Sequence, residues 1–243
     1  MKNKFLLIVL QISMMAYLTL SAQAPLLQNV SGRKTISLDG RWQSQIDMYG
    51  VASGDRSGLV KDRKPVKYEF KGDNLRNTEL VEQDLDVGEQ LQVPGDWNTQ
   101  RENLSFYEGN MWYRKKIPIT PQTGKRYFLH FGAVNYEAVV YLNGTKLGQH
   151  EGGFTAFQFE VTSLLQSGEN TVLVNANNIR GENNIPTNIT DWWNYGGITR
   201  SVNLIEVPET YISDYFIQLE KGKTTDIKGW VKLEGSQKNQ NIT

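Results

Sequence analysis

One ten-residue segment concentrates side chains with the chemistry to contact a small polar ligand. Residues 191–200 spell DWWNYGGITR, in which three aromatic rings and two adjacent glycines lie between Asp191 and Arg200. Aromatic faces stack on the C–H faces of sugar rings, and a carboxylate accepts paired hydrogen bonds from hydroxyls. Adjacent glycines let a backbone turn sharply and approach its neighbours closely. On composition alone, a structural corner with buried tryptophans is the better interpretation, because buried aromatic side chains are common.

This segment is the last of seven short sequence blocks that follow one another along the chain. The other six are LDGRW (38–42), VPGDWN (93–98), YEGNMWYR (107–114), FGAV (131–134), YLNG (141–144) and GQHEGGFT (148–155). Together the seven resemble the N-terminal sugar-binding domain of family 2 glycoside hydrolases, the family of β-galactosidases and β-glucuronidases. The resemblance runs from Leu38 to Val207. The residues at 107–113 and 193–198 are more similar to those of β-glucuronidases than to those of β-galactosidases.

Composition excludes some classes of partner. The 243 residues carry 26 basic and 26 acidic side chains, mixed along the chain, so the net charge is zero. Without a basic stripe or an acidic tail, neither a nucleic acid nor a strongly charged partner is expected. Aromatic residues make up 11% of the chain, which suits a β-rich core or contacts with carbohydrate.

Residues 1–24 are predicted to be a cleaved signal peptide. Lys2 and Lys4 precede a mostly apolar stretch from Phe5 to Leu20, and small residues follow at 21–24. The absence of cysteine excludes disulfides and a lipid-carrying N-terminal cysteine. The mature product is therefore expected in the periplasm or medium of a bacterium, with no membrane attachment after cleavage.

The rest of the chain is predicted to be all-β. Phe157, Phe159 and Val161 alternate with polar residues, as in a strand with one buried face, and Asn143–Gly144 is a two-residue hairpin signal. Many short strands with regular turns indicate a β-sandwich. The resemblance implies a jelly roll, like that of galactose-binding domains, over residues 25–208. The segment 53–90 is polar and irregular, and we expect it to be a long surface insertion.

Residues 209–243 are predicted to begin a second sandwich. Two strands are expected, at 211–219 and 227–233, and the resemblance implies the start of an immunoglobulin-like domain there. Such a domain needs ~100 residues, so this one is incomplete.

The resemblance also implies that the catalytic residues lie elsewhere. A retaining glycosidase uses two carboxylates roughly 5 Å apart, and in this family both are glutamates on a (β/α)₈ barrel. The acid/base glutamate follows an asparagine, but this sequence has no Asn-Glu dipeptide, and a barrel of ~250 residues does not fit after Val207. We therefore assign no catalytic residue and expect the chain alone to be inactive. The full-length enzyme is expected to be a retaining β-glycosidase and a homo-oligomer.

Asp191 is the one predicted substrate-binding residue. The resemblance implies that it reaches the mouth of the barrel and accepts hydrogen bonds from sugar hydroxyls. The alternative is a salt bridge to Arg200 or a local turn cap. Trp192 and Trp193 are expected to fill a core or an interface, and Asn194 and Arg200 to hold the turn.

No metal or other cofactor is predicted. His130 lies in an apolar strand and His150 beside a glycine pair, so both are interpreted as structural. Two histidines without cysteine give no recognisable metal-ligand spacing.

The sequence is compatible with three hypotheses about the function of the chain. The first is the N-terminal part of an exported β-glucuronidase-like enzyme, with a β-galactosidase-type enzyme as its variant. The second is a free carbohydrate-binding module, which predicts weak sugar binding by the isolated chain. The third is an inert truncated product.

Overall fold

The computed structural model describes residues 25–50, 85–86 and 88–235. The predicted signal peptide at 1–24 lies outside the described residues, as does most of the predicted insertion at 53–90. The last two residues of that predicted insertion, Glu89 and Gln90, belong to a strand, because they pair with Ser44 and Gln43. Within the described residues, no helix is long and apolar enough to cross a membrane.

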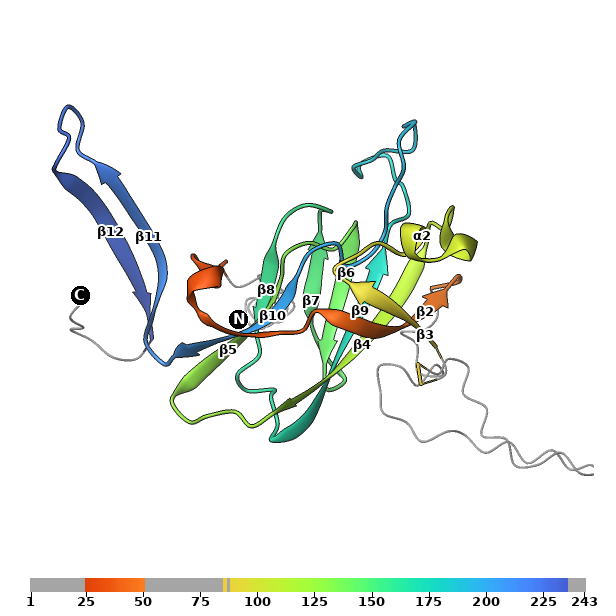
Figure 1. The fold of residues 1–243 in the computed structure, drawn as a ribbon, viewed down its shortest axis with the longest axis horizontal. Helices are drawn as coiled ribbons and strands as arrows, with labels where there is room; N and C mark the ends of the chain where they lie inside the picture. The colour runs from red at the N-terminus through yellow and green to blue at the C-terminus, as the bar shows by residue number, and fades with distance from the viewer. Residues whose placement is uncertain (1–24, 51–84, 87, 236–243) are drawn as a thin grey trace, which may run out of the picture.

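Two antiparallel sheets form a sandwich (Figure 1). In spatial order, the smaller sheet contains β1 (Lys34–Ser37), β10 (Val202–Pro208), β5 (Lys125–Phe131) and β8 (Phe157–Glu160). The larger contains β3 (Glu89–Val93), β2 (Gly40–Asp47), β4 (Asn110–Ile119), β9 (Gly168–Asn177), β6 (Glu137–Leu142) and β7 (Thr145–Glu151). The spatial order departs from the chain order in both sheets, and the predicted all-β jelly-roll sandwich is confirmed.

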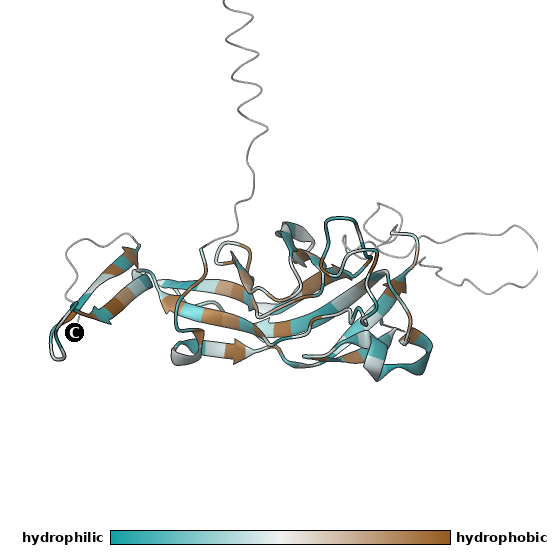
Figure 2. Cartoon of the chain, turned by 90° about the horizontal axis from the view of Figure 1, so that it is seen from above, coloured by the Kyte–Doolittle hydropathy of each residue, from teal (hydrophilic) through white to brown (hydrophobic). Residues whose placement is uncertain are grey.

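The core lies between the inward faces of the two sheets. Trp42 from β2, Tyr113 from β4 and Phe131 from β5 are fully buried in one apolar cluster. Apolar and polar bands follow one another along the strands in Figure 2. Phe157 stacks on Phe131 with ring centroids 4.9 Å apart. Phe157, Phe159 and Val161 are buried and Glu160 is exposed, as the predicted alternation requires, but Gln158 is buried, so the prediction is wrong at that position.

Short turns and helices connect the strands. Asn143, at φ 49°, and Gly144 join β6 to β7, as the sequence predicted. The helical pieces among the described residues are brief: η1 (Val30–Gly32), α2 (Trp97–Gln100) and η2 (Glu102–Leu104). Helix α2 and η2 lie at the same end of the sandwich as the segment between β9 and β10 (Figure 1).

A separate hairpin follows the sandwich. Strands β11 (Tyr211–Leu219) and β12 (Ile227–Glu234) pair only with each other and project away from the two larger sheets (Figure 1). Both strands agree with the sequence prediction to within one residue. Side chains such as Phe216, Ile217 and Trp230 are about half exposed.

Candidate functional site

The segment between β9 and β10 meets the α2–η2 region in a pocket of about 220 Å³. The lining side chains come from two stretches that are distant in sequence: Asn98, Ser105, Phe106 and Glu108 on one side, and Arg180, Thr190, Asp191, Trp192, Trp193 and Asn194 on the other. Carboxylate, guanidinium and aromatic groups thus share one concave surface.

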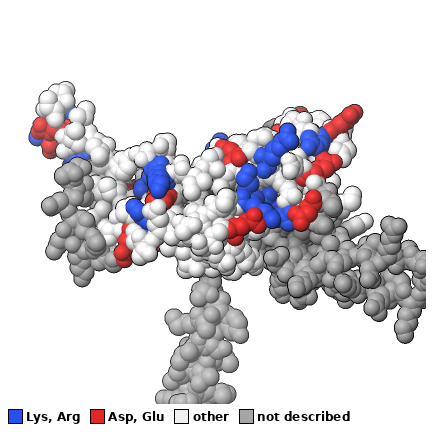
Figure 3. Space-filling view, turned by 60° about the horizontal axis from the view of Figure 1, so that its bottom comes forward, with Lys and Arg blue, Asp and Glu red and all other residues white. Residues whose placement is uncertain are grey.

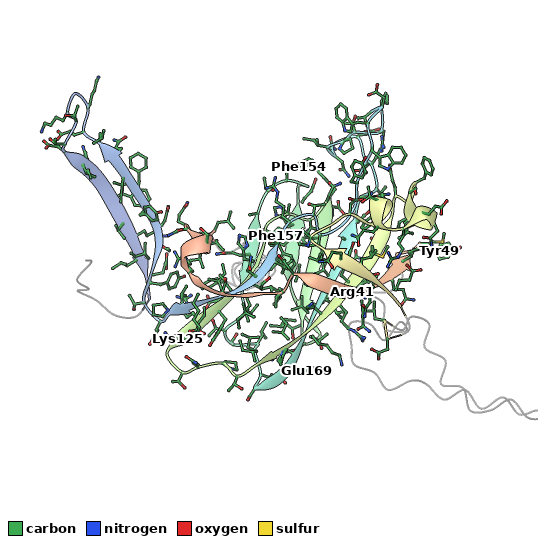
Figure 4. The ribbon with its side chains drawn as sticks, viewed as in Figure 1. Arg41, Tyr49, Lys125, Phe154, Phe157 and Glu169 are labelled. Carbon is green, nitrogen blue, oxygen red and sulfur yellow. The ribbon has the colours of Figure 1, made fainter. Side chains whose placement is uncertain are left out.

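Asp191 lines this pocket with an exposed side chain. Within the described part of the chain, its carboxylate has no hydrogen-bond or ion-pair partner. Arg200 instead donates to the carbonyl of Phe154 at 3.0 Å. The alternative of an Asp191–Arg200 salt bridge is therefore wrong, and both carboxylate oxygens are open to a ligand. Figure 4 labels Phe154 in the loop above the sheets.

The two glycines of the segment let the backbone pack against its neighbours. A Cβ atom on Gly196 would lie 2.0 Å from the ring of Trp97, and one on Gly197 would lie 2.7 Å from the carbonyl oxygen of Gly95. Gly197 also has φ +139°, a conformation that side-chain-bearing residues rarely adopt. The predicted close approach is confirmed.

Buried asparagine side chains fix the turn. Asn98 accepts the Gly196 N–H at 2.9 Å and donates to the carbonyls of Leu104 and Tyr107, each at 3.0 Å. Asn194 accepts from Asn135 at 3.1 Å and donates to the carbonyl of Asn178. These bonds satisfy backbone groups that no strand ladder reaches. Asn194 therefore holds the turn, as predicted.

Trp192 and Trp193 do not fill the core, since they are 61% and 45% exposed, and packing in an interface, the other half of the expectation, stays a prediction. The position beneath the turn is already taken by Trp97, which packs against Gly196. Trp193 instead donates its indole N–H to the carbonyl of Ser105 at 3.0 Å. Its ring lies 5.1 Å from that of Phe106, at the rim of the pocket.

No role was predicted for Arg180 or Glu108, yet both line the pocket as charged side chains. Arg180 Nε donates to Glu108 Oε1 at 2.8 Å. Arg180 also bonds both neighbours of Asp191: the carbonyl and hydroxyl of Thr190, and the carbonyl of Trp192. Glu108 lies inside the 107–114 block, but no local pattern marks Arg180.

Both histidines lie away from this pocket. His150 bonds the Thr155 hydroxyl at 3.0 Å and stacks on Phe157, so it packs its turn against the sheet as predicted. His130 is partly buried in β5, and burial lowers its pKa below the ordinary value. Its Nδ1 is buried and has no hydrogen-bond partner among the described residues.

Charges of both signs are interspersed over the face of the molecule shown in Figure 3. In residues 25–50, 85–86 and 88–235, no three histidine or acidic side chains come together as a metal site would require. The pocket offers the Asp191 carboxylate and exposed aromatic rings, groups that can contact a polar ligand.

Comparison with known proteins relates this chain to glycoside hydrolases. The family described as glycosyl hydrolases family 2, sugar binding domain, matches residues 35–208. A β-glucuronidase of Bacteroides fragilis is 40% identical over 145 residues, which are 58% of this chain and 20% of that protein. A putative β-glucuronidase of Formosa agariphila is 31% identical over 152 residues, or 61% of this chain and 18% of that protein. The chain thus spans about a fifth of the length of these relatives.

Solved structures share the fold. A Ruminococcus gnavus β-glucuronidase superimposes with a TM-score of 0.68 at 24% identity, covering 88% of this chain and 35% of the other.

Proposed function

The chain belongs to glycosyl hydrolases family 2 through a sugar-binding domain at residues 35–208, and from this premise we propose that it is the N-terminal, non-catalytic part of a β-glucuronidase-like enzyme. The complete enzyme hydrolyses terminal β-linked sugars with retention of configuration. Its two catalytic glutamates belong to a barrel beyond this chain. A β-galactosidase-type specificity is the variant of this proposal, because a sandwich scaffold does not determine the substrate.

The open carboxylate of Asp191 is the observation that carries the proposal. A carboxylate with both oxygens unpaired accepts two hydrogen bonds from neighbouring hydroxyls of one sugar. The pocket around it, at about 220 Å³, is smaller than the ~300 Å³ at which complete small-molecule sites begin. The size fits one wall of a larger site that another domain completes.

The exposed rings at the rim support a second candidate function, that of an independent carbohydrate-binding module. Phe106, Trp193 and Tyr195 form a row in which successive ring centroids are 5.1 and 6.3 Å apart. Such rows stack on sugar faces without help from another domain. Calorimetry on the isolated chain distinguishes the two functions: weak sugar binding favours the module, and no binding favours the incomplete site.

We further propose that the enzyme is exported. The positive residues Lys2 and Lys4 and the apolar stretch after them support a cleaved signal peptide, and hence the periplasm or the medium as its location. A homo-oligomer of the complete enzyme is part of the same proposal.

Kinetics of the complete enzyme test the role of Asp191. Asp191→Ala should lower kcat/KM by about 2 kcal/mol or more, because a charge-assisted hydrogen bond to the sugar is lost. Glu182→Ala is the matched control, since Glu182 is an exposed acid in the same segment but does not line the pocket. Equal kinetics for both variants would reject the proposal.

A further inference from the structure

Arg180 binds the backbone on both sides of Asp191. Its Nη1 donates to the Thr190 carbonyl at 3.1 Å and to the Thr190 hydroxyl at 2.8 Å, and its Nη2 donates to the Trp192 carbonyl at 3.2 Å. A planar guanidinium that holds residues 190 and 192 together restricts the backbone between them. That restriction sets the direction of the Asp191 Cα–Cβ bond, and hence the side of the segment on which its carboxylate lies.

Arg180 and Glu108 both lie close to the ends of strands of the larger sheet. Arg180 follows β9 by three residues, and Glu108 precedes β4 by two. These two strands pair with each other, with Asn110 opposite Asn177. Just beyond that pair, Gly109 donates its N–H to the side chain of Asn178 at 2.9 Å. The ion pair between Arg180 and Glu108 therefore starts from two neighbouring strand ends rather than from free loops.

Arg180 itself is not placed to bind a ligand. Four hydrogen bonds already go from its guanidinium to protein groups, and Glu108 neutralises its charge at 2.8 Å. The side chains of Arg180 and Glu108 are only 22% and 33% exposed. Both are thus more enclosed than most surface ion pairs, which favours a defined geometry.

We propose that the Arg180–Glu108 pair is a positioning device that holds the Asp191 carboxylate toward the pocket, ready to accept two sugar hydroxyls. This inference rests on the proposed function, because Asp191 must contact the sugar for its orientation to matter. A preorganised carboxylate binds without a further loss of loop entropy. In this proposal Arg180 and Glu108 act through the Asp191 carboxylate, so both are positioning residues.

The first test is hydrogen exchange on the 243-residue chain. Arg180→Lys keeps the positive charge near Glu108 but loses the fork that bonds Thr190 and Trp192. We expect faster amide exchange in this variant at Gly196 and Gly197, the nearest residues of the turn whose N–H groups are hydrogen-bonded, to Asn98 and Asn135. Arg126→Lys is the matched control, since the Arg126–Glu160 pair has side-chain exposures of 26% and 37% and lies on the smaller sheet. Unchanged exchange at Gly196 and Gly197 in Arg180→Lys would overturn the inference.

The second test is a double-mutant cycle in the complete enzyme. Arg180→Lys and Glu108→Gln should each lower kcat/KM by about tenfold, since a misplacement of ~1 Å can cost roughly 100-fold. In an Asp191→Ala background, the same changes should have less than about a twofold effect, because the group that they position is gone. Glu160→Gln should leave kcat/KM unchanged in both backgrounds.

The outcomes separate the two proposals. If Asp191→Ala has no effect on kcat/KM, the proposed function fails. If Asp191→Ala is damaging but Arg180→Lys is not, the positioning role alone fails. An effect of Arg180→Lys that is equally large with and without Asp191 would also overturn the positioning role, because it would act through some other part of the fold.

Discussion

The indole ring of Trp97 fills the space beside Gly196, so that a Cβ atom on Gly196 would lie 2.0 Å from Trp97 Cζ2. Trp97 is fully buried and lies beneath the turn that carries Asp191. This contact joins the core of the sandwich to the wall of the pocket.

Gly196→Ala should therefore destabilise the fold. The added methyl group must displace a buried ring, which costs about 3 kcal/mol of the free energy of unfolding. Gly124→Ala is the comparison, because Gly124 has open space and only a positive φ of +74°, which costs about 1 kcal/mol. Urea denaturation of both variants measures the difference. Equal stabilities would contradict the close packing at Gly196.

Asn98→Ala should also destabilise the chain. The substitution removes the partner of the Gly196 N–H and of the carbonyls of Leu104 and Tyr107. Buried backbone groups left without partners cost about 1–3 kcal/mol. Asn175→Ala serves as the control, since within the described residues no hydrogen bond of the Asn175 side chain is present. If thermal unfolding gave the same loss for both variants, the bracing role of Asn98 would be refuted.

Stability should fall as the solution is acidified from about pH 7.5 to about pH 5.5. Burial lowers the pKa of His130 and of His150 below the ordinary value of about 6.5. The unfolded chain then binds protons that the folded chain does not, so stability is complete above pH ~6.5 and is lost as the pH falls toward the folded pKa.

His130→Gln removes one of these two titrating groups, and the chain has only two histidines. Denaturant unfolding at both pH values should show a smaller loss on acidification in this variant than in the unaltered chain. An unaltered chain that was more stable at the lower pH would show that the assigned direction is wrong.

The sandwich should depend on residues just beyond the predicted boundary at 208. Tyr211 is 8% exposed and packs edge-on against Phe128, with ring centroids 5.7 Å apart. Arg33 also donates to the carbonyl of Ile212 at 2.6 Å. A chain spanning 25–213 should be more stable than one spanning 25–208 by about 2 kcal/mol, the value of burying one large side chain. Equal melting temperatures would show that Tyr211 contributes nothing.

The sequence was sufficient for the parts of the fold that local patterns determine. Alternating apolar residues predicted the strands, and Asn143–Gly144 predicted a hairpin that forms with Asn143 at a positive φ. The glycine pair predicted a close approach of backbone to core, although only the structure identifies Trp97 as the neighbour. The family resemblance supplied the jelly-roll topology, because periodicity does not distinguish one sandwich from another.

The pocket was less predictable, since its walls come from distant parts of the chain. Arg180 and Glu108 are 72 positions apart, so no spacing in the sequence connects them. The presence of two tryptophans at 192 and 193 does not reveal whether their side chains are buried or exposed. Their exposure follows from Trp97 already occupying the core beneath the turn, a three-dimensional fact that local sequence does not contain.

The measurement that tests the central claim most directly is the coupling between Asp191 and individual hydroxyls of the sugar. In the complete enzyme, kcat/KM would be compared for an aryl β-glucuronide and its 2-, 3- and 4-deoxy analogues, with and without Asp191→Ala. We predict at least one position where removal of the hydroxyl costs about tenfold or more with Asp191 present and almost nothing in Asp191→Ala. Equal costs with and without Asp191 at every position would contradict a contact between this carboxylate and the sugar.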